Sequence, residues 1–360
     1  MSKTDKLMHE GQFQQAEILL RQLEVSEPHN VAVHAELGLV LAKQGKLSDA
    51  VIEYRKALAL EPHKPTVEYN LGLAEFKQGH FGAAAMAFKS VAGAIQPNTQ
   101  LDMLLGMSYY GGRQFSKAIP FLSAVDKEQP SNLELHYVLA ESCLRSEQPQ
   151  CAIDKCQEIL EQNPNSAQAH MLLGEALDGM SKTDDAIEEF RAAERVAPTQ
   201  PNIHFGLGYL YWESHDYNHA FPEFQAELKN DPNSAQSYTY LGDITYRNND
   251  DHAAESYLKN AIHLQPGIRL AYFDLGAVYA RQQKGDAAIA NFLAAEKLDP
   301  GNPDAHYRLG RLYMAEGRRQ EAAKELAQTR KLNQQTKEPL IDKMSGQDAA
   351  GLPSARRVQP

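Results

Sequence analysis

The chain has 360 residues, of which 42% are apolar and 23% are charged, and this composition is typical of a folded protein rather than a disordered one. At this length one compact core is not expected, so the sequence predicts either several domains or an extended repeat array. The formal net charge of -11 argues against a nucleic-acid or membrane-surface partner and favours neutral or basic partners.

The N-terminal segment Met1–Glu10 lacks the apolar core of a secretory signal, and no stretch of the chain approaches 18 consecutive apolar residues. We therefore expect a cytoplasmic protein without direct membrane insertion, unless an export signal lies upstream of Met1. The three cysteines give no disulfide framework and no metal-binding spacing, so buried thiols are expected. A disulfide between Cys143 and Cys156 is the alternative.

A period of 34 residues begins at Val31 and continues to about Thr336 without an insertion. The residue that follows each periodic leucine is glycine in eight repeats and Ala140 in the other. These columns predict a first helix in each repeat, helix A, whose small residue lets a neighbouring helix approach closely. The leucine column consists of Leu37, Leu71, Leu105, Leu139, Leu173, Leu207, Leu241, Leu275 and Leu309.

An alanine column and a column of larger residues four positions later predict a second helix, helix B. The alternation of a small and a large side chain on one face is what interlocking antiparallel helices require. Glycines such as Gly45, Gly79 and Gly317 separate the two helices, and a proline closes most repeats. The larger residues are Tyr54, Phe88, Leu122, Cys156, Phe190, Phe224, Leu258, Phe292 and Leu326.

This pattern of Leu-Gly, Ala-x-x-x-aromatic and terminal proline resembles the tetratricopeptide repeat (TPR) family. The resemblance implies an all-α, right-handed superhelical solenoid of stacked antiparallel helix pairs, with helix A on the concave wall. Residues 31–336 would form nine tandem repeats in one solenoid, and residues 1–30 a partial N-terminal repeat with a shortened helix A. Residues 337–360 are expected to be a short, mostly disordered extension.

The binding surface of such a solenoid is sought among the helix A side chains that packing between repeats does not use. Aromatic residues and methionines dominate this set, and such residues are the usual anchors of protein recognition. Trp212, together with Phe205 and Tyr209, is the expected hot spot. For any single residue the alternative is a packing role between adjacent A helices. The predicted peptide-binding groove consists of Tyr69, Phe76, Met107, Tyr110, Tyr137, Glu141, Glu175, Asp178, Phe205, Tyr209, Trp212, Tyr240, Asp243, Tyr246, Arg247, Arg281 and Arg308.

The charged members of this groove change sign along the chain, from Glu141, Glu175, Asp178 and Asp243 to the arginines that follow. Such polarity suits an extended or helical peptide of matching charge order that carries apolar anchors. The alternative is that these charges only solvate an open surface.

No catalytic, cofactor or metal site is predicted. Phosphate-binding loops and nucleophile motifs are absent from the sequence as recognisable patterns. Five histidines recur in frame, but they fill a column that also holds Tyr238 and Tyr272, which favours a half-buried packing role. Shared coordination by equivalent helices about 8–10 Å apart would be awkward. The histidines are His34, His136, His170, His204 and His306.

The sequence therefore predicts a non-catalytic scaffold or assembly factor that binds peptide segments of other proteins. The alternative is an accessory or regulatory subunit that positions a separate enzyme or a secretion or envelope-assembly machine. A shortened first helix would leave part of the apolar surface around Ile18, Leu19, Leu20 and Leu23 uncovered. A homodimer through this N-terminal end, another partner, or sequence upstream of Met1 would cover it.

Overall fold

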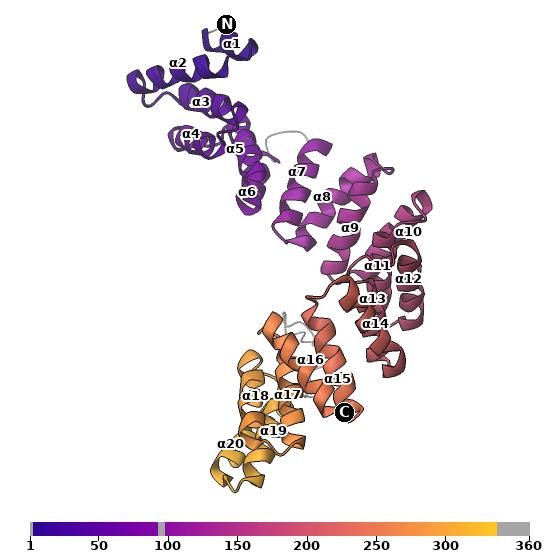
Figure 1. Cartoon of the computed structure of the whole chain (residues 1–360). Helices are drawn as coiled ribbons and strands as arrows, with labels where there is room; N and C mark the ends of the chain where they lie inside the picture. Colours follow the sequence, from indigo (N-terminus) through magenta and orange to yellow (C-terminus); the bar gives the residue numbers. More distant parts are fainter. Residues whose placement is uncertain (1–2, 93–97, 337–360) are drawn as a thin grey trace, which may run out of the picture. The chain divides into compact units, whose positions relative to one another are not determined.

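The structure is a computed structural model that describes residues 3–92 and 98–336, and within these ranges it contains twenty helices and no strand (Figure 1). The chain divides into two compact units, Met1–Pro198 and Thr199–Pro360. The first unit holds α1 to α12 and the second holds α13 to α20.

The helices of the first unit are α1 (Lys3–His9), α2 (Phe13–Ser26), α3 (Val31–Lys43), α4 (Leu47–Leu60), α5 (Pro65–Lys77), α6 (Phe81–Ala92), α7 (Thr99–Gly111), α8 (Phe115–Glu128), α9 (Leu133–Arg145), α10 (Pro149–Gln162), α11 (Ala167–Gly179) and α12 (Thr183–Val196). Those of the second unit are α13 (Ile203–Glu213), α14 (Tyr217–Asn230), α15 (Ala235–Arg247), α16 (Asp251–Leu264), α17 (Arg269–Arg281), α18 (Gly285–Leu298), α19 (Pro303–Ala315) and α20 (Arg319–Thr336).

Each odd-numbered helix packs against the even-numbered helix that follows it. Within each unit the even-numbered helix then packs against the next odd-numbered one, so the pairs form a continuous stack. Helix A and helix B of the sequence prediction are therefore the odd-numbered and even-numbered helices. The predicted all-α fold of stacked helix pairs is confirmed.

The glycine column of helix A lies against the large residues of helix B. A Cβ atom built on Gly72 would lie 2.6 Å from the ring of Phe88, and one on Gly174 would lie 2.7 Å from the ring of Phe190. These distances are too short for a methyl group, so each ring occupies the space that the missing side chain leaves. The predicted pairing of a small and a large residue is therefore what brings the two helices of a repeat together.

Each turn between helix A and helix B of the periodic repeats contains one residue with left-handed backbone. Three of these residues are the predicted breakers Gly45, Gly79 and Gly317, with φ of 78°, 77° and 77°. The six other turns use residues with a side chain at the same position of the 34-residue frame, with φ between 56° and 62°. They are Arg113, Glu147, Ser181, His215, Asn249 and Gln283.

At the N-terminus, α1 has only 7 residues, but its Leu7 and Met8 pack against the core cluster that contains Leu20 of α2. Leu20 is buried, and Leu23 packs against the same core. The expectation that this apolar surface would stay uncovered is therefore wrong for these two leucines, because α1 and α3 both contribute to the core around them. Ile18 remains 62% exposed. The predicted C-terminal extension, 337–360, lies outside the described residues.

Candidate functional site

Four of the predicted groove residues form an aromatic cluster in the second unit. Phe205, Tyr209 and Trp212 lie on α13, and Tyr240 lies on α15. The ring centroid of Tyr240 is 4.9 Å from that of Trp212, 5.8 Å from that of Tyr209 and 5.9 Å from that of Phe205. All four side chains are half-buried, so their rings pack together and still present area to solvent.

The innermost member of this cluster is Tyr240. Its ring stacks on the buried ring of Phe224 at 5.1 Å between centroids. Burial raises the pKa of the Tyr240 hydroxyl above its ordinary value, and the nearby Tyr209 and Asp243 raise it further. Tyr240 therefore joins the aromatic cluster to the helix-packing core.

Asp243 links the aromatic cluster to an arginine. Trp212 Nε1 donates a hydrogen bond of 2.6 Å to Asp243 Oδ2. Arg247 Nε donates to both carboxylate oxygens of Asp243, at 2.9 and 2.7 Å. Since Asp243 is only 2% exposed, it orients Trp212 and Arg247 rather than offering a carboxylate to solvent.

The Arg281 side chain already binds other residues of the protein. Its guanidinium lies 4.0 Å from the ring centroid of Tyr246 and donates to the Tyr246 carbonyl oxygen at 2.8 Å. It also forms an ion pair with Asp251 and donates to Asn249. Arg308 lies 5.9 Å from the ring centroid of Phe273 and is exposed. Arg281 is therefore engaged in contacts within the protein, whereas the exposed Arg308 contacts the Phe273 ring.

In the first unit, three predicted acidic residues come together on α9 and α11. Tyr110 donates a hydrogen bond of 2.5 Å to Glu141 Oε2. Burial raises the pKa of Glu175, and the charges of Glu141 and Asp178 add to the rise while Arg145 opposes it. These acidic groups are thus close enough to influence one another.

The remaining groove residues of the first unit are mainly engaged in packing. Tyr69 makes an edge contact with Phe88 at 5.8 Å, and Phe76 makes one with Phe81 at 5.5 Å. Met107 packs against the core cluster around Leu122. The hydroxyl of Tyr137 lies 2.5 Å from that of Ser166.

Among the seventeen predicted groove residues, Asp243 is buried, Arg247, Arg281 and Arg308 are exposed, and the others are half-buried. They lie on odd-numbered helices of both units. Their part in binding a peptide stays a prediction.

The recurring histidines contact acidic residues that the sequence analysis did not connect with them. His34 Nδ1 lies 2.8 Å from Glu53 Oε2, and His306 Nδ1 lies 2.6 Å from Glu325 Oε2. The same spacing of 19 residues pairs His170 with Glu189 and His204 with Glu223. This regular spacing was a signal available in the sequence. Each pair ties helix A to helix B of one repeat.

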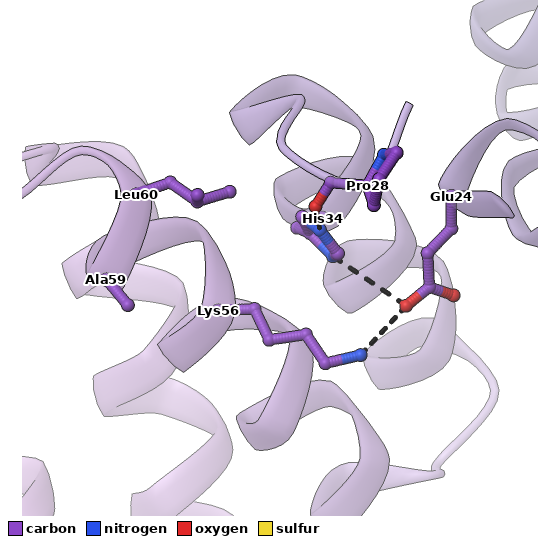
Figure 2. Close-up of a pocket in the computed structure, with 6 residues that line it drawn as sticks. All are labelled: Glu24, Pro28, His34, Lys56, Ala59 and Leu60. Carbon is purple, nitrogen blue, oxygen red and sulfur yellow. Dashed lines mark hydrogen bonds and ion pairs between the residues drawn. The ribbon is translucent and has the colours of Figure 1, made fainter. Parts of the chain in front are cut away.

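A pocket of about 330 Å³ opens beside His34, between Pro28, Leu60 and the ammonium group of Lys56 (Figure 2). Lys56 Nζ lies 2.8 Å from Glu24 Oε1 and 2.9 Å from Glu53 Oε1. One ligand atom each of Glu24, His34 and Glu53 lies within 4.8 Å of the others. Imidazole and carboxylate are metal-ligand types, but here a lysine already supplies the positive charge.

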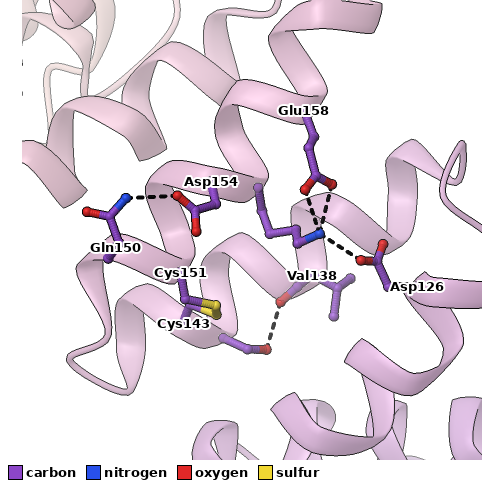
Figure 3. Close-up of a disulfide and its surroundings, with 9 residues drawn as sticks. Asp126, Val138, Cys143, Gln150, Cys151, Asp154 and Glu158 are labelled. Atoms are coloured by element: carbon purple, nitrogen blue, oxygen red, sulfur yellow. Dashed lines mark hydrogen bonds and ion pairs between the residues drawn. A yellow bond between two sulfur atoms is a disulfide. The ribbon is translucent and has the colours of Figure 1, made fainter.

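A second cluster of this kind surrounds His136. Its Nε2 lies 2.8 Å from Asp126 Oδ1 and 3.4 Å from Glu158 Oε2. Lys155 Nζ lies 2.7 Å from Asp126 Oδ2 and 2.7 Å from Glu158 Oε2, in the region drawn in Figure 3. A lysine therefore again supplies the cation between two carboxylates.

Cys143 and Cys151 form a disulfide, with their Cα atoms 5.7 Å apart (Figure 3). The expectation of buried thiols is therefore wrong for this pair, and the alternative pairing of Cys143 with Cys156 is wrong as well. The chain reverses between α9 and α10, which brings the start of α10 back to the end of α9. Cys156 keeps a free, buried thiol.

Taken together, the stacked helix pairs define the class of the molecule as an α-helical repeat protein. Two family models are described as tetratricopeptide repeat. One matches residues 109–176 and 279–341. The other matches residues 171–235, 205–268 and 239–303. A third, described as TPR repeat, matches residues 38–79. The chain belongs to the tetratricopeptide repeat family.

Several solved structures are similar to this chain. PilW, a type IV pilus biogenesis factor, is 20% identical with a TM-score of 0.50, over 55% of this chain and 92% of PilW. YrrB, a TPR protein with an unusual peptide-binding site, is 22% identical with a TM-score of 0.43, over 50% of this chain and 93% of YrrB. MamA is 25% identical with a TM-score of 0.41, over 46% of this chain and 96% of MamA. At these levels the likeness to PilW concerns the fold alone.

No curated protein matches the chain. Within residues 3–92 and 98–336, none of the helices combines the length and the apolar character needed to cross a membrane.

Proposed function

We propose that the chain is a non-catalytic scaffold or assembly factor that binds peptide segments of other proteins along its odd-numbered helices. The observation that carries this proposal is the aromatic cluster of Phe205, Tyr209, Trp212 and Tyr240 on the neighbouring helices α13 and α15. Half-buried rings held by their neighbours offer a wide contact area and lose little side-chain entropy on binding. Proteins of this family typically act as interaction modules rather than catalysts, which supports the proposal.

The partner we propose is a neutral to basic segment with apolar anchors. The net charge of -11 favours such a partner over an acidic one. In the first unit, the acidic group of Glu141, Glu175 and Asp178 on α9 and α11 would attract the basic side chains of a bound segment. In the second unit, the aromatic cluster would receive apolar side chains. A cytoplasmic location belongs to the same proposal.

The alternative proposal is an accessory or regulatory subunit that positions a separate enzyme or assembly machine. PilW, whose fold is similar, is a type IV pilus biogenesis factor. In such a role the same surface would hold a subunit of the machine rather than a transient peptide.

The test is a double substitution, Tyr209→Ala with Trp212→Ala, followed by affinity capture and mass spectrometry of the partners. We expect capture to fall at least about tenfold, because several kcal/mol of binding energy commonly rest on such anchors. Tyr257→Ala, on the even-numbered helix α16, is the matched aromatic control and should capture normally. Unchanged helical circular dichroism would exclude loss of fold, and unchanged capture by the double variant would contradict the proposal.

A spectroscopic readout is also available, since Trp212 is the only tryptophan in the chain. A captured segment, made as a synthetic peptide and titrated into the protein, should change the Trp212 fluorescence with the same affinity that calorimetry measures. A segment that binds without changing this signal would place the binding surface elsewhere.

A further inference from the structure

We propose that Glu296, His306 and Glu325 form a binding site for a divalent transition-metal cation such as Zn²⁺ in the second unit. The three residues come from three successive helices, α18, α19 and α20. His306 Nδ1 lies 2.6 Å from Glu325 Oε2 and 3.9 Å from Glu296 Oε1. One ligand atom from each residue lies within 4.8 Å of the others.

These distances suit a metal ion after small side-chain movements. Zinc binds nitrogen and oxygen at roughly 2.0–2.2 Å, so ligand atoms at tetrahedral angles lie about 3.4 Å apart. The separations of the His306 nitrogen from the two carboxylates lie on either side of this value. To bind a metal, the Glu325 carboxylate would move away from the imidazole and the Glu296 carboxylate would move closer to it.

The repeat frame provides independent evidence that a cation belongs at this position. Glu24, His34 and Glu53 occupy the same three positions of an earlier repeat, and the ammonium group of Lys56 contacts both of their carboxylates. Asp126, His136 and Glu158 form a similar cluster in another repeat, and Lys155 contacts both of the acidic groups there. In both places the fold surrounds one positive charge with two carboxylates and an imidazole.

The cluster in the last repeat lacks this lysine. Gln328 stands at the position that corresponds to Lys56. Among the described residues, no lysine or arginine forms an ion pair with Glu296 or Glu325. Two carboxylates held this close repel each other unless a positive charge lies between them, and a divalent cation would supply it.

The environment of His306 is also suited to a ligand. His34 Nε2 lies 3.0 Å from the Pro28 carbonyl oxygen, so both ring nitrogens of His34 face an oxygen atom of the chain. His306 Nε2 is buried without a hydrogen-bond partner, whereas its Nδ1 faces the carboxylates of both Glu296 and Glu325. Nδ1 is therefore the ring nitrogen that is placed to bind a metal. The Glu296 side chain is 28% exposed, which leaves a route for the ion.

The decisive variant is Gln328→Lys, which removes no ligand. By analogy with Lys56, the new ammonium group should occupy the cation position from the same place on helix B. The full-length protein and this variant would be titrated with Zn²⁺ by calorimetry and equilibrium dialysis, and circular dichroism would verify the fold. His306→Gln removes the central ligand. His170→Gln is the matched control, since His170 pairs with Glu189 but has Leu160 where the cluster has Glu296.

We expect the wild-type chain and His170→Gln to bind one more equivalent of Zn²⁺ than Gln328→Lys and His306→Gln do. The loss of an outer-shell partner typically lowers metal affinity roughly 10–100-fold. The Zn²⁺ affinity of this site should fall at least as much in Gln328→Lys and His306→Gln. Equal Zn²⁺ binding by the wild-type chain and Gln328→Lys would overturn the proposal, whether both bind or neither binds.

Discussion

Gly208 and Phe224 share one space between helices α13 and α14. A Cβ atom on Gly208 would lie 2.9 Å from Cδ1 and 2.9 Å from Cε1 of the Phe224 ring, which is itself fully buried. The ring therefore lies flat against the backbone of the opposing helix. The Gly column recurs for this reason, and where Ala140 replaces glycine the residue sixteen positions later is Cys156 rather than a larger one.

The first prediction follows from this contact. Gly208→Ala should lower the free energy of unfolding by about 1–3 kcal/mol, because the added methyl group has to displace a packed ring. Gly82→Ala is the control, since Gly82 lies in α6 with nothing within 4 Å of an added Cβ. That substitution should stabilise the chain by up to about 1 kcal/mol through helix propensity alone. Urea titrations of both variants measure the difference, and effects of the same sign would refute the packing argument.

The second prediction concerns the left-handed residue in the turn before α18. Gln283 has φ of 60°, a conformation that costs a residue with a side chain roughly 1–2 kcal/mol. Gln283→Gly should remove this strain at an entropic cost of roughly 0.5–1 kcal/mol, and so raise stability by roughly 0.5–1 kcal/mol. Gly45→Ala, at the equivalent turn with φ of 78°, should have the opposite effect. Thermal unfolding midpoints compare the two, and a destabilised Gln283→Gly would show that the turn is held by the glutamine side chain.

The third prediction concerns Asp274, which is 4% exposed and whose Oδ2 has no hydrogen-bond partner. Burial raises the pKa of its carboxyl group well above the ordinary value, and the charge of Asp243 adds to the rise while Arg247 and two other arginines oppose it. The neutral form is thus favoured in the folded state. Its stabilising effect is complete below the unfolded-state pKa of about 3.9 and is lost as the pH rises through the raised folded-state pKa.

Asp274→Asn should therefore be more stable than the wild-type chain at pH 7, and the difference should shrink as the pH falls toward 4. Denaturation curves between pH 4 and pH 8 test this. A stability difference that does not vary with pH would mean that Asp274 has no raised pKa.

The fourth prediction concerns Cys156. Burial raises the pKa of its thiol to about 12, and the charges of Glu189 and Glu175 contribute. Since the thiolate is the reactive form, iodoacetamide at pH 8 should leave the native chain unlabelled and should label Cys156 only after unfolding. Rapid labelling of the native protein would contradict this burial.

The same experiment bears on the cellular location. Unfolded without reductant, the chain should expose one reactive thiol if the disulfide between Cys143 and Cys151 has formed, and three if it has not. Disulfides persist mainly in oxidising compartments. Three reactive thiols in freshly isolated protein would agree with the proposed cytoplasmic location, and one would argue against it.

The helix pairs could be predicted from the sequence because each depends on residue columns that repeat every 34 positions. The same residue types stand at corresponding positions of the other repeats, as the columns of Leu207, Gly208, Ala220 and Phe224 show. An ambiguous position in one repeat can therefore be assigned from its counterparts in the others. The left-handed turn residues were predicted only where they are glycine. Gln283 and five other residues with a side chain adopt the same conformation, and the sequence analysis did not predict it for them.

The repeating sequence by itself determined which segments become helices and which faces of them pack, because hydrophobic period and glycine placement act locally and identically in every repeat. The 19-residue spacing of the His–Glu pairs was present in the sequence, but only the tertiary structure decided the polar contacts outside such recurring positions. The contact of Trp212 with Asp243, for example, spans 31 residues and joins α13 to α15. Such contacts depend on how neighbouring helices are placed and on which rotamer each side chain adopts, and no column of the sequence specifies either.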